Sequence, residues 1–222
     1  MNTTNQANKI CAVIPFYNEQ NTIRTIIEDT LKYVDEVIAV NDGSNDSSMN
    51  ELKGIERLTL IESSINLGKG DALRKGFIHS YNGNFDITIT LDADLQHDPS
   101  LIPAFLPLLD EFDVVIGNRL NDLKPMPFHR RISNKITSIL LSKKLNVNIE
   151  DSQCGYRAYR TRILPLIQTK SDGFEAESEI LVKAVRNNLR IGFVNIPAVY
   201  GNEKSKMKPV QAIIGFTKVL LS

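Results

Sequence analysis

The sequence has too few cysteines for disulfide bonds to stabilise it. Only two of its 222 residues are cysteine, which is not a disulfide framework. Cys11 lies in an apolar run typical of a strand, and Cys154 lies far away along the chain. We therefore expect reduced thiols and a cytoplasmic location.

Long apolar runs are absent as well. No run reaches the length of about 18 apolar residues that a membrane-spanning helix needs, although 42% of the chain is hydrophobic and can form a core. The polar start, residues 1–9, lacks the apolar centre of a secretory signal, and we expect it to be a disordered tail. Any work at a membrane would need peripheral attachment to its cytoplasmic face, directly or through a membrane-anchoring partner protein.

The net charge is zero, but the charges are unevenly distributed. Residues 1–120 contain 9 Lys/Arg and 18 Asp/Glu, whereas residues 121–222 contain 17 and 8. A basic half favours a polyanionic or membrane-surface partner, although two unlike halves could simply attract each other. Nucleic acid is not expected, because aromatic residues are sparse in this half and no recognised binding module occurs. Without a clear linker or repeat, we expect one domain, 1–222, with 121–222 as its basic part.

Short apolar runs alternate with helical patterns along the chain. Strands are predicted at residues 10–14, 36–40, 58–61, 85–91, 113–117 and 191–196. Strand, helix and strand at this spacing are typical of right-handed crossovers in a parallel sheet. The predicted fold class is α/β, with a Rossmann-like, mostly parallel sheet and helices on both faces. Ligands of such sheets bind beyond the carboxyl ends of the strands.

One polar stretch follows the fourth predicted strand. Asp92, Asp94 and Gln96 alternate there, and in extended backbone residues two apart project to the same side. Their oxygens could converge just beyond the strand. Such a set suits a hard cation, Mg²⁺ or Mn²⁺, whose coordination is completed by substrate phosphates. The alternative is an ordinary acidic turn.

Two cations lie where they could meet an anion. Lys69 stands between two glycines at the start of a predicted helix, where backbone amides favour negative charge. The spacing is not that of a Walker A loop, and a plain connection to the helix is the alternative. Arg119 follows the strand at 113–117 and could reach a phosphate, or it could be a surface arginine.

A basic amphipathic helix is predicted at residues 128–145. This segment has five Lys/Arg and no acid, and Ile132, Ile136, Ile139 and Leu140 share one helical face. Such a helix is typical of one lying on a membrane surface. The alternative is an ordinary helix that packs this face on the sheet.

The polar motifs of the chain form an ordered series. They are Pro15-Phe16-Tyr17-Asn18-Glu19, Asn41-Asp42-Gly43-Ser44, Asn66-Leu67-Gly68-Lys69-Gly70, Asp92-Ala93-Asp94-Leu95-Gln96-His97-Asp98-Pro99, Gly117-Asn118-Arg119, Asp151-Ser152-Gln153-Cys154-Gly155-Tyr156-Arg157 and Ser205-Lys206. In this order they resemble the inverting glycosyltransferases of family 2. The closest likeness is to the dolichyl-phosphate mannosyltransferase branch, which uses polyprenyl-phosphate acceptors. The resemblance implies the GT-A nucleotide-diphospho-sugar transferase fold.

The resemblance also implies roles for the matching residues on the donor side. The nucleotide pocket would be lined by Pro15, Tyr17, Glu19, Val40 and Asp42. Asp92 and Ala93 would contact the donor, while Asp94 and Gln96, with Asp92 beside them, would hold the metal on its diphosphate.

Further residues match positions near the reacting phosphates. Arg119 and Lys206 would act with Asp92 and Asp94 in catalysis by stabilising phosphate charge. Arg131 and Ser133 fall near the acceptor-phosphate contacts of the family. Two positions depart from its pattern, because Asn41 replaces an aspartate and Tyr200 replaces an acceptor-binding arginine.

The implied activity is metal-dependent transfer of a sugar to a dolichyl or undecaprenyl phosphate. The donor would be a nucleotide-diphospho-sugar of the GDP-mannose or UDP-glucose type. The alternative is a family 2 enzyme with a sugar-hydroxyl acceptor, for which Asp151 or Glu175 is the candidate base. A non-catalytic nucleotide-sugar-binding subunit is less expected, because the two acids and the arginine are present. A sugar-nucleotide pyrophosphorylase would carry a glycine-rich loop after the first strand.

Overall fold

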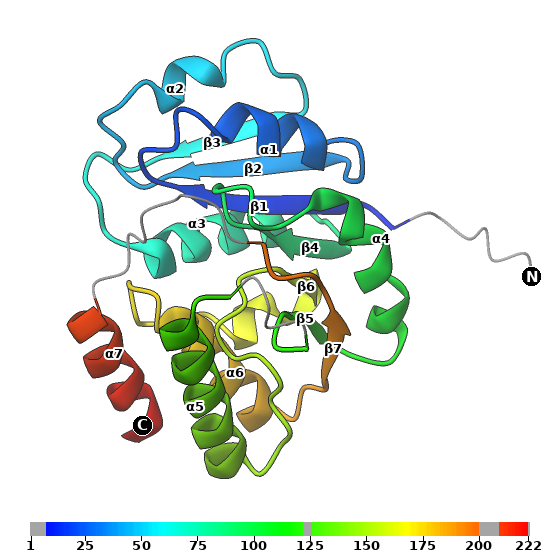
Figure 1. The fold of residues 1–222 in the computed structure, drawn as a ribbon. Helices are drawn as coiled ribbons and strands as arrows, with labels where there is room; N and C mark the ends of the chain where they lie inside the picture. Colours follow the sequence, from blue (N-terminus) through cyan, green and yellow to red (C-terminus); the bar gives the residue numbers. More distant parts are fainter. Residues whose placement is uncertain (1–7, 122–125, 200–208, 222) are drawn as a thin grey trace, which may run out of the picture.

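A seven-stranded sheet forms the centre of the computed structural model, which describes residues 8–121, 126–199 and 209–221 (Figure 1). The strands are β1 (Ile10–Phe16), β2 (Glu36–Asn41), β3 (Leu58–Glu62), β4 (Ile87–Thr90), β5 (Val114–Asn118), β6 (Arg157–Arg160) and β7 (Ile191–Asn195). Their order is β3-β2-β1-β4-β6-β5-β7. β6 runs antiparallel to β4 and β5, and the other described pairs are parallel. The prediction of a mostly parallel α/β sheet is confirmed.

Helices pack on both faces of this sheet. They are α1 (Ile23–Thr30), α2 (Ser48–Glu51), α3 (Lys69–Asn82), α4 (Ile102–Phe105), α5 (Phe128–Leu145), α6 (Ala176–Arg186) and α7 (Pro209–Leu221). Figure 1 shows α1 in front of the sheet and α3 behind it. The segment before β5 is not one continuous helix but a short α4 between two 3₁₀ turns. Pro103 and Pro107 lack the amide hydrogen that a continuous helix needs.

The apolar runs of the sequence form the core. Ile14 of β1, Ile38 of β2 and Ile89 of β4 are completely buried, as expected for strands covered on both faces. Cys11 and Cys154 are buried free thiols, and burial raises their pKa values to about 11 and about 12. None of the described helices combines the length and the hydropathy that a membrane span requires.

Strand β6 was not predicted, because its sequence, Arg157-Ala158-Tyr159-Arg160, is charged at both ends. The Arg157 side chain is nevertheless buried. Its guanidinium donates hydrogen bonds to the backbone carbonyls of Ser152, Cys154 and Glu177, at 3.1, 2.7 and 2.9 Å. These bonds compensate the burial of the charge, so an arginine can occupy a position that usually requires an apolar residue.

Candidate active site

Four strand ends meet at one edge of the sheet. In the register of the sheet, Phe16 of β1 lies beside Asn41 of β2, and Thr90 of β4 lies beside Arg157. Ile116 of β5 also pairs with Arg157. Antiparallel β6 therefore begins where parallel β4 and β5 end. The predicted site residues that follow these strands are brought together at this carboxyl edge.

The acidic stretch after β4 turns back on itself. Leu95 has a positive φ of 62°, and Asp94 Oδ1 accepts a hydrogen bond from the Gln96 amide at 3.1 Å. An aspartate commonly bonds to the backbone two residues later in such turns. The prediction that Asp92, Asp94 and Gln96 converge from an extended backbone is therefore wrong about the backbone conformation. A tight turn brings Asp94 and Gln96 together.

Two buried rings anchor this turn. The Asp92 amide donates to His97 Nδ1 at 3.0 Å, and burial lowers the pKa of His97 to about 4. His97 is thus neutral, and its 3.8 Å approach to the Asp92 carboxylate is not an ion pair. Tyr156 packs beside His97 and donates to the Asp98 carbonyl at 3.0 Å. Asp98 caps the following 3₁₀ turn, since its carboxylate accepts from the Ser100 amide.

Lys69 contacts carboxylates at this edge. Its Nζ donates to Asp92 Oδ1 at 2.5 Å and to Glu177 Oε1 at 2.6 Å. Burial alone would lower the pKa of Lys69, but the two carboxylates outweigh it and raise the pKa. The Lys69 ammonium likewise outweighs the burial of Asp92 and holds the pKa of that carboxyl below its ordinary value. Lys69, which was predicted to meet an anion of the substrate, has internal anions as partners.

The loop after β2 is fixed to the loop before α3. Both oxygens of buried Asp42 accept backbone amide hydrogen bonds, from Leu67 and Gly68, at 2.8 Å each. Burial raises the pKa of Asp42, against the effect of these two bonds. The Asn41 Oδ1 accepts from the Ser44 amide at 2.9 Å. An amide oxygen is sufficient for that bond, so Asn41 can replace the usual aspartate within this turn.

The remaining residues predicted to line the nucleotide pocket follow or end β1 and β2. Pro15 and Val40 are paired neighbours in the sheet and both are buried, so they lie beneath the edge. Tyr17 and Glu19 are half-buried in the loop after β1. The Glu19 amide donates to Ser48 Oγ at 2.8 Å, which ties this loop to the start of α2.

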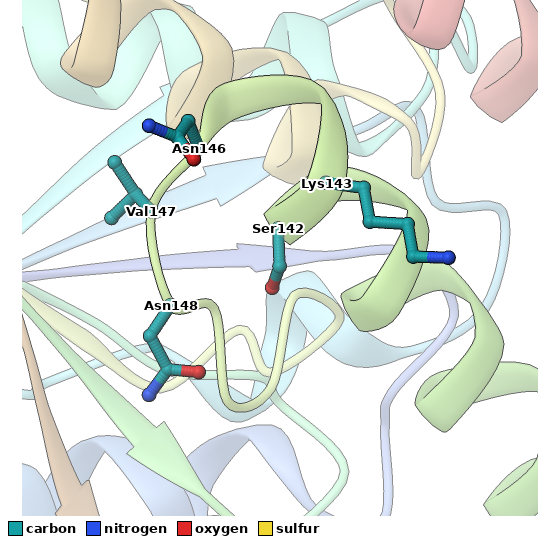
Figure 2. Close-up of a pocket in the computed structure, with 5 residues that line it drawn as sticks. All are labelled: Ser142, Lys143, Asn146, Val147 and Asn148. Atoms are coloured by element: carbon teal, nitrogen blue, oxygen red, sulfur yellow. The ribbon is translucent and has the colours of Figure 1, made fainter.

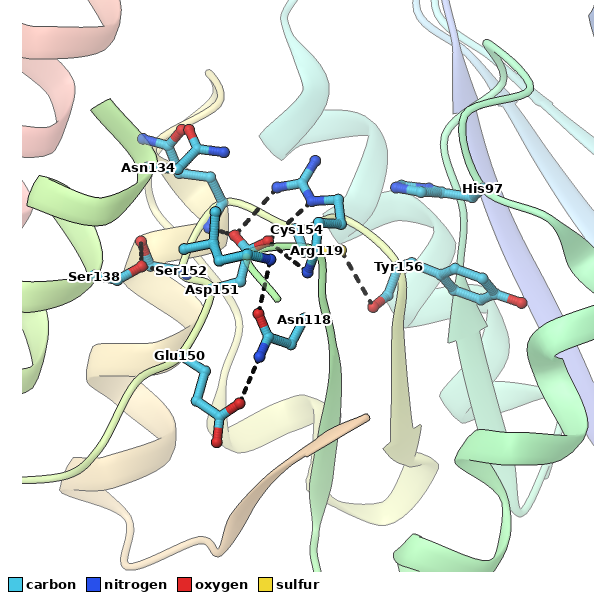
Figure 3. A network of polar contacts seen from close by, with 12 residues as sticks. His97, Asn118, Arg119, Asn134, Ser138, Glu150, Asp151, Ser152, Cys154 and Tyr156 are labelled. Carbon is cyan, nitrogen blue, oxygen red and sulfur yellow. Dashed lines mark hydrogen bonds and ion pairs between the residues drawn. The ribbon is translucent and has the colours of Figure 1, made fainter. Parts of the chain in front are cut away.

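Arg119 forms a bidentate ion pair with Asp151 (Figure 3). Its Nε donates to Asp151 Oδ2 at 2.9 Å, and its Nη2 donates to Oδ1 at 3.1 Å. Asp151 is completely buried, and Oδ1 also accepts from the Gln153 amide at 3.1 Å. The partners of Asp151 therefore make it an anchor for Arg119, just beyond β5.

Hydroxyl groups of α5 hold the loop that carries Asp151. Ser138 Oγ accepts from the Ser152 amide at 3.0 Å, and Ser152 Oγ donates to Thr137 Oγ1 at 3.2 Å. Arg131 is half-buried with its Nε donating to the Met126 carbonyl, and Ser133 is exposed. Lys206, Ser205 and Tyr200 lie outside the described residues.

Two residues that contribute to this edge were missed as site residues. Arg157 was noted only as part of a motif, and Glu177 is one of two acids in the first turn of α6. An acid at a helix start gives no signal of its own, because the helix dipole favours it in any case. Only the packing of α6 against the start of α3 brings Glu177 to Lys69.

Two hollows lie away from this edge. One of 380 Å³ at the end of α5 is lined by Ser142, Lys143, Asn146, Val147 and Asn148 (Figure 2). Another of 190 Å³ lies at the amino edge of the sheet, next to Phe85 and Arg160. Neither contains a predicted site residue. The chemistry of the strand ends, rather than cavity size, identifies the candidate site.

The side-chain oxygens at the carboxyl edge of the sheet supply only part of the coordination that a metal ion needs. Among the described residues, no group of three or more His, Cys, Asp or Glu is arranged to hold an ion. Asp94 supplies a carboxylate and Gln96 an amide oxygen, both half-buried. Hard cations such as Mg²⁺ accept this kind of incomplete protein set when phosphates and water complete the coordination.

Comparison with known proteins agrees with this geometry. The family model described as glycosyl transferase family 2 matches residues 11–166. The UDP-N-acetylglucosamine–dolichyl-phosphate N-acetylglucosaminyltransferase of Methanococcus voltae is 29% identical, over 93% of this chain and 92% of that protein. The undecaprenyl-phosphate 4-deoxy-4-formamido-L-arabinose transferase of Proteus mirabilis is 33% identical, over 74% of this chain but 52% of that protein.

Solved structures resemble the fold. Glucosyl-3-phosphoglycerate synthase of Mycobacterium tuberculosis, crystallised with Mn²⁺, UDP and glucosyl-3-phosphoglycerate, gives a TM-score of 0.75. The match covers 96% of this chain and 78% of that one, at 18% identity. With a family model that covers more than half of its length, this chain belongs to glycosyl transferase family 2 and is an enzyme with the GT-A fold.

Proposed function

We propose that this glycosyltransferase moves a sugar from a nucleotide-diphospho-sugar to a polyprenyl phosphate, with inversion at the anomeric carbon. The observation that carries the proposal is the carboxyl edge of the sheet, where Asp92, Asp94 and Gln96 follow β4 and Arg119 follows β5. The names of the M. voltae and P. mirabilis relatives specify dolichyl and undecaprenyl phosphates, which supports this acceptor class. The former name adds UDP-N-acetylglucosamine to the donor candidates, GDP-mannose and UDP-glucose.

The donor would lie across the ends of β1, β2 and β4. Tyr17 and Glu19 would contact the nucleotide over the buried floor of Pro15 and Val40, with Asp42 fixing the adjoining loops. The donor would extend toward Lys69, Asp92 and Ala93. Ala93 is buried, so its contribution would come from the backbone.

Asp94 and Gln96 would hold Mg²⁺ or Mn²⁺, with Asp92 beside them. Asp92 Oδ1 already accepts from Lys69, which leaves Oδ2 for the donor or the ion. Mn²⁺ in the structurally similar synthase supports a divalent ion. Once bound, such an ion would neutralise charge on the departing diphosphate.

Transfer would need no general base. An oxygen of the acceptor phosphate forms a bond to the anomeric carbon, while the bond from that carbon to the diphosphate oxygen breaks. The electron pair leaves with the nucleoside diphosphate. Arg119 and Lys206 would stabilise phosphate charge in this step, and Arg131 and Ser133 would contact the acceptor phosphate.

A sugar-hydroxyl acceptor would need a base, and both candidates are engaged. Asp151 is buried with both oxygens on Arg119. The Glu175 carboxyl packs against Gly215 of α7, so closely that a Cβ on that glycine would lie 2.7 Å from Glu175 Cδ. These contacts support the phosphate acceptor.

The enzyme would bind the lipid surface through α5. The side of α5 facing the protein is mainly polar, with Asn134, Thr137 and Ser138 buried. Its outer side carries the apolar residues Phe128, Ile132, Ile136, Ile139 and Leu140, which are 41–74% exposed. The cations and the lack of acids on α5 complement anionic lipid, so a bilayer is the proposed partner of this face. The alternative attachment, a membrane-anchoring protein, would bind without lipid.

A transfer assay tests the proposal. Purified protein is incubated with each donor, Mg²⁺ or Mn²⁺, and a short-chain polyprenyl phosphate, and products are identified by mass. We expect a glycosylated lipid phosphate with at least one donor. Donor hydrolysis without lipid product would favour a hydroxyl acceptor, and no donor consumption with either metal would contradict the proposal.

A further inference from the structure

We infer that Glu177 is a positioning residue of the donor site, which holds the Lys69 ammonium against Asp92 and thereby orients the Asp92 carboxylate. The role of Asp92 as a donor contact rests on the proposed function. The contacts among the three side chains are independent of the proposed function. These side chains come from three segments of the chain: the first residue of α3, the loop after β4 and the first turn of α6.

The three groups form a compact charged cluster. The Lys69 ammonium lies 2.5 Å from Asp92 Oδ1 and 2.6 Å from Glu177 Oε1. The side chain of Glu177 is only 8% exposed, Lys69 is 14% exposed and Asp92 is 30% exposed. Exposure thus increases from the helix toward the strand edge. Glu177 is the inner partner, and Asp92 is the one that can face a ligand.

The backbone leaves space for this cluster. A Cβ on Gly155 would lie 2.7 Å from Glu177 Oε1, 2.8 Å from Lys69 Nζ and 3.0 Å from Asp92 Oδ2. A side chain at this position would displace all three groups. The loop between α5 and β6 therefore passes directly over the cluster, and a glycine is needed there because of this close approach.

The second carboxylate has a physical consequence for Asp92. One carboxylate would suffice to neutralise Lys69, and the other leaves the cluster with a net negative charge. A lysine with a single partner on a flexible stem can change rotamer, whereas two partners from different elements fix its ammonium. Fixing the ammonium fixes Asp92 Oδ1, and so determines where Oδ2 points.

The neighbouring Glu179 provides a matched control. It lies on the same helix, pairs with Lys183 at 2.9 Å and accepts from the Ser171 amide at 2.9 Å. Its partners all lie on α6 or the preceding loop. Glu177→Gln and Glu179→Gln each remove one mostly buried, lysine-paired carboxylate, but only Glu177 shares its lysine with Asp92.

The test compares these variants in transfer kinetics and in chemical unfolding, alone and combined with Asp92→Asn. We expect Glu177→Gln to lower kcat about tenfold or more, as for a lost positioning contact, with Glu179→Gln within about twofold. Asp92→Asn should cost less in the Glu177→Gln background than in wild type, because the two residues act through one ammonium. Equal kcat for the two glutamine variants, or independent multiplicative effects of positions 92 and 177, would overturn the inference.

Failure of the proposed function gives a different result. Wild-type protein would then turn over no nucleotide sugar, and the unfolding data alone decide the inference. Non-additive unfolding free energies for Asp92→Asn and Glu177→Gln would support the orientation of Asp92 by Glu177. Additive values would reject it. If Glu177→Gln folds poorly, the Lys69→Met/Glu177→Gln pair, which removes both charges, replaces it in each comparison.

Discussion

At the scale of single residues, hydrogen-bond partners separate the structural carboxylates from those that can meet a ligand. Asp42 and Asp151 each have both oxygens engaged by groups of the chain itself. Asp92 has one oxygen on Lys69, and Asp94 lies half-buried in the turn after β4. The sequence alone does not distinguish these four acids. Their different surroundings lead to different expected effects of mutation.

The first prediction concerns Asp94. Asp94→Asn should lower donor turnover at least about 100-fold, because it removes a charge expected to hold the metal on the diphosphate. Turnover is measured against Mn²⁺ concentration. Asp98→Asn is the control, since asparagine caps a helical turn as well as aspartate does. Retained turnover with unchanged Mn²⁺ dependence in Asp94→Asn would rule out the metal assignment.

The second prediction concerns Asp151. Asp151→Asn should lower kcat about tenfold or more by releasing the Arg119 guanidinium, without changing the shape of the pH–rate profile. A general base would instead show its own acidic limb in that profile, and the variant would lose it. Glu150→Gln is the neighbouring control, because its amide oxygen can still accept from Asn118 Nδ2. Loss of the acidic limb would revive the hydroxyl-acceptor alternative.

At the scale of elements, α5 reverses the usual arrangement of a surface helix. A helix on a sheet normally buries its apolar stripe. The Ile132, Ile136, Ile139 and Leu140 stripe of α5 is exposed, while hydroxyl groups on its other side bond to the loop that carries Asp151. The alternative that α5 packs this stripe on the sheet is therefore excluded.

The third prediction tests this face. Ile136→Ser combined with Ile139→Ser should weaken binding to anionic vesicles roughly 10- to 100-fold, from the loss of two partly buried isoleucine side chains. Binding is measured by co-sedimentation. Ile78→Ser on α3, where the isoleucine is similarly exposed, should have no effect. Vesicle binding that is equal in all variants would place the membrane contact elsewhere.

The fourth prediction concerns β6. Arg157→Met should reduce the free energy of unfolding by about 3 kcal/mol, because three buried carbonyls lose their donor. Arg160→Met, in the same strand, should cost about 0.5 kcal/mol or less, since its ion pair with Asp110 is long and exposed. Both values come from urea unfolding. An equal loss of unfolding free energy in both variants would mean that the buried hydrogen bonds of Arg157 do not stabilise the fold.

At the scale of the whole molecule, the helices of the basic part lie at one end of the protein. Figure 1 shows α5, α6 and α7 together, away from β3, and Lys144 of α5 donates to the Leu220 carbonyl of α7 at 2.6 Å. Lys135 and Lys143 are exposed and pair with no acid among the described residues. Ion pairs of arginines in this half with Asp110 and Asp113 are 3.7–4.0 Å long. Ion pairs between the two halves therefore do not neutralise all of the exposed lysines, and these lysines can contact an anionic partner.

The fifth prediction follows from this distribution. Binding to anionic vesicles should fall at least about tenfold as NaCl rises to about 0.5 M, because salt screens exposed charges. Binding to neutral vesicles should change little under the same conditions. A membrane interaction that is insensitive to salt would mean that the apolar stripe acts without the basic charge.

Much of the fold was determined by local patterns in the sequence. The apolar runs predicted the parallel strands β1–β5 and β7, because strands covered on both faces need continuous apolar sequence. The helical face of residues 128–145 predicted α5 with its bounds. The series of polar motifs also resembled glycosyl transferase family 2. The positions of these motifs after parallel strands predicted that their side chains meet at one edge.

Tertiary structure decided what local patterns cannot encode. Arg157 is a strand residue because carbonyls from two other segments satisfy its charge, and Glu177 reaches Lys69 because α6 packs against the start of α3. The turn at Leu95, rather than extended backbone, joins Asp94 to Gln96. Which face of α5 is buried also depended on its neighbours. Glu177 lies far from both Lys69 and Arg157 in sequence, so its contribution to the free energy exists only after the chain has folded.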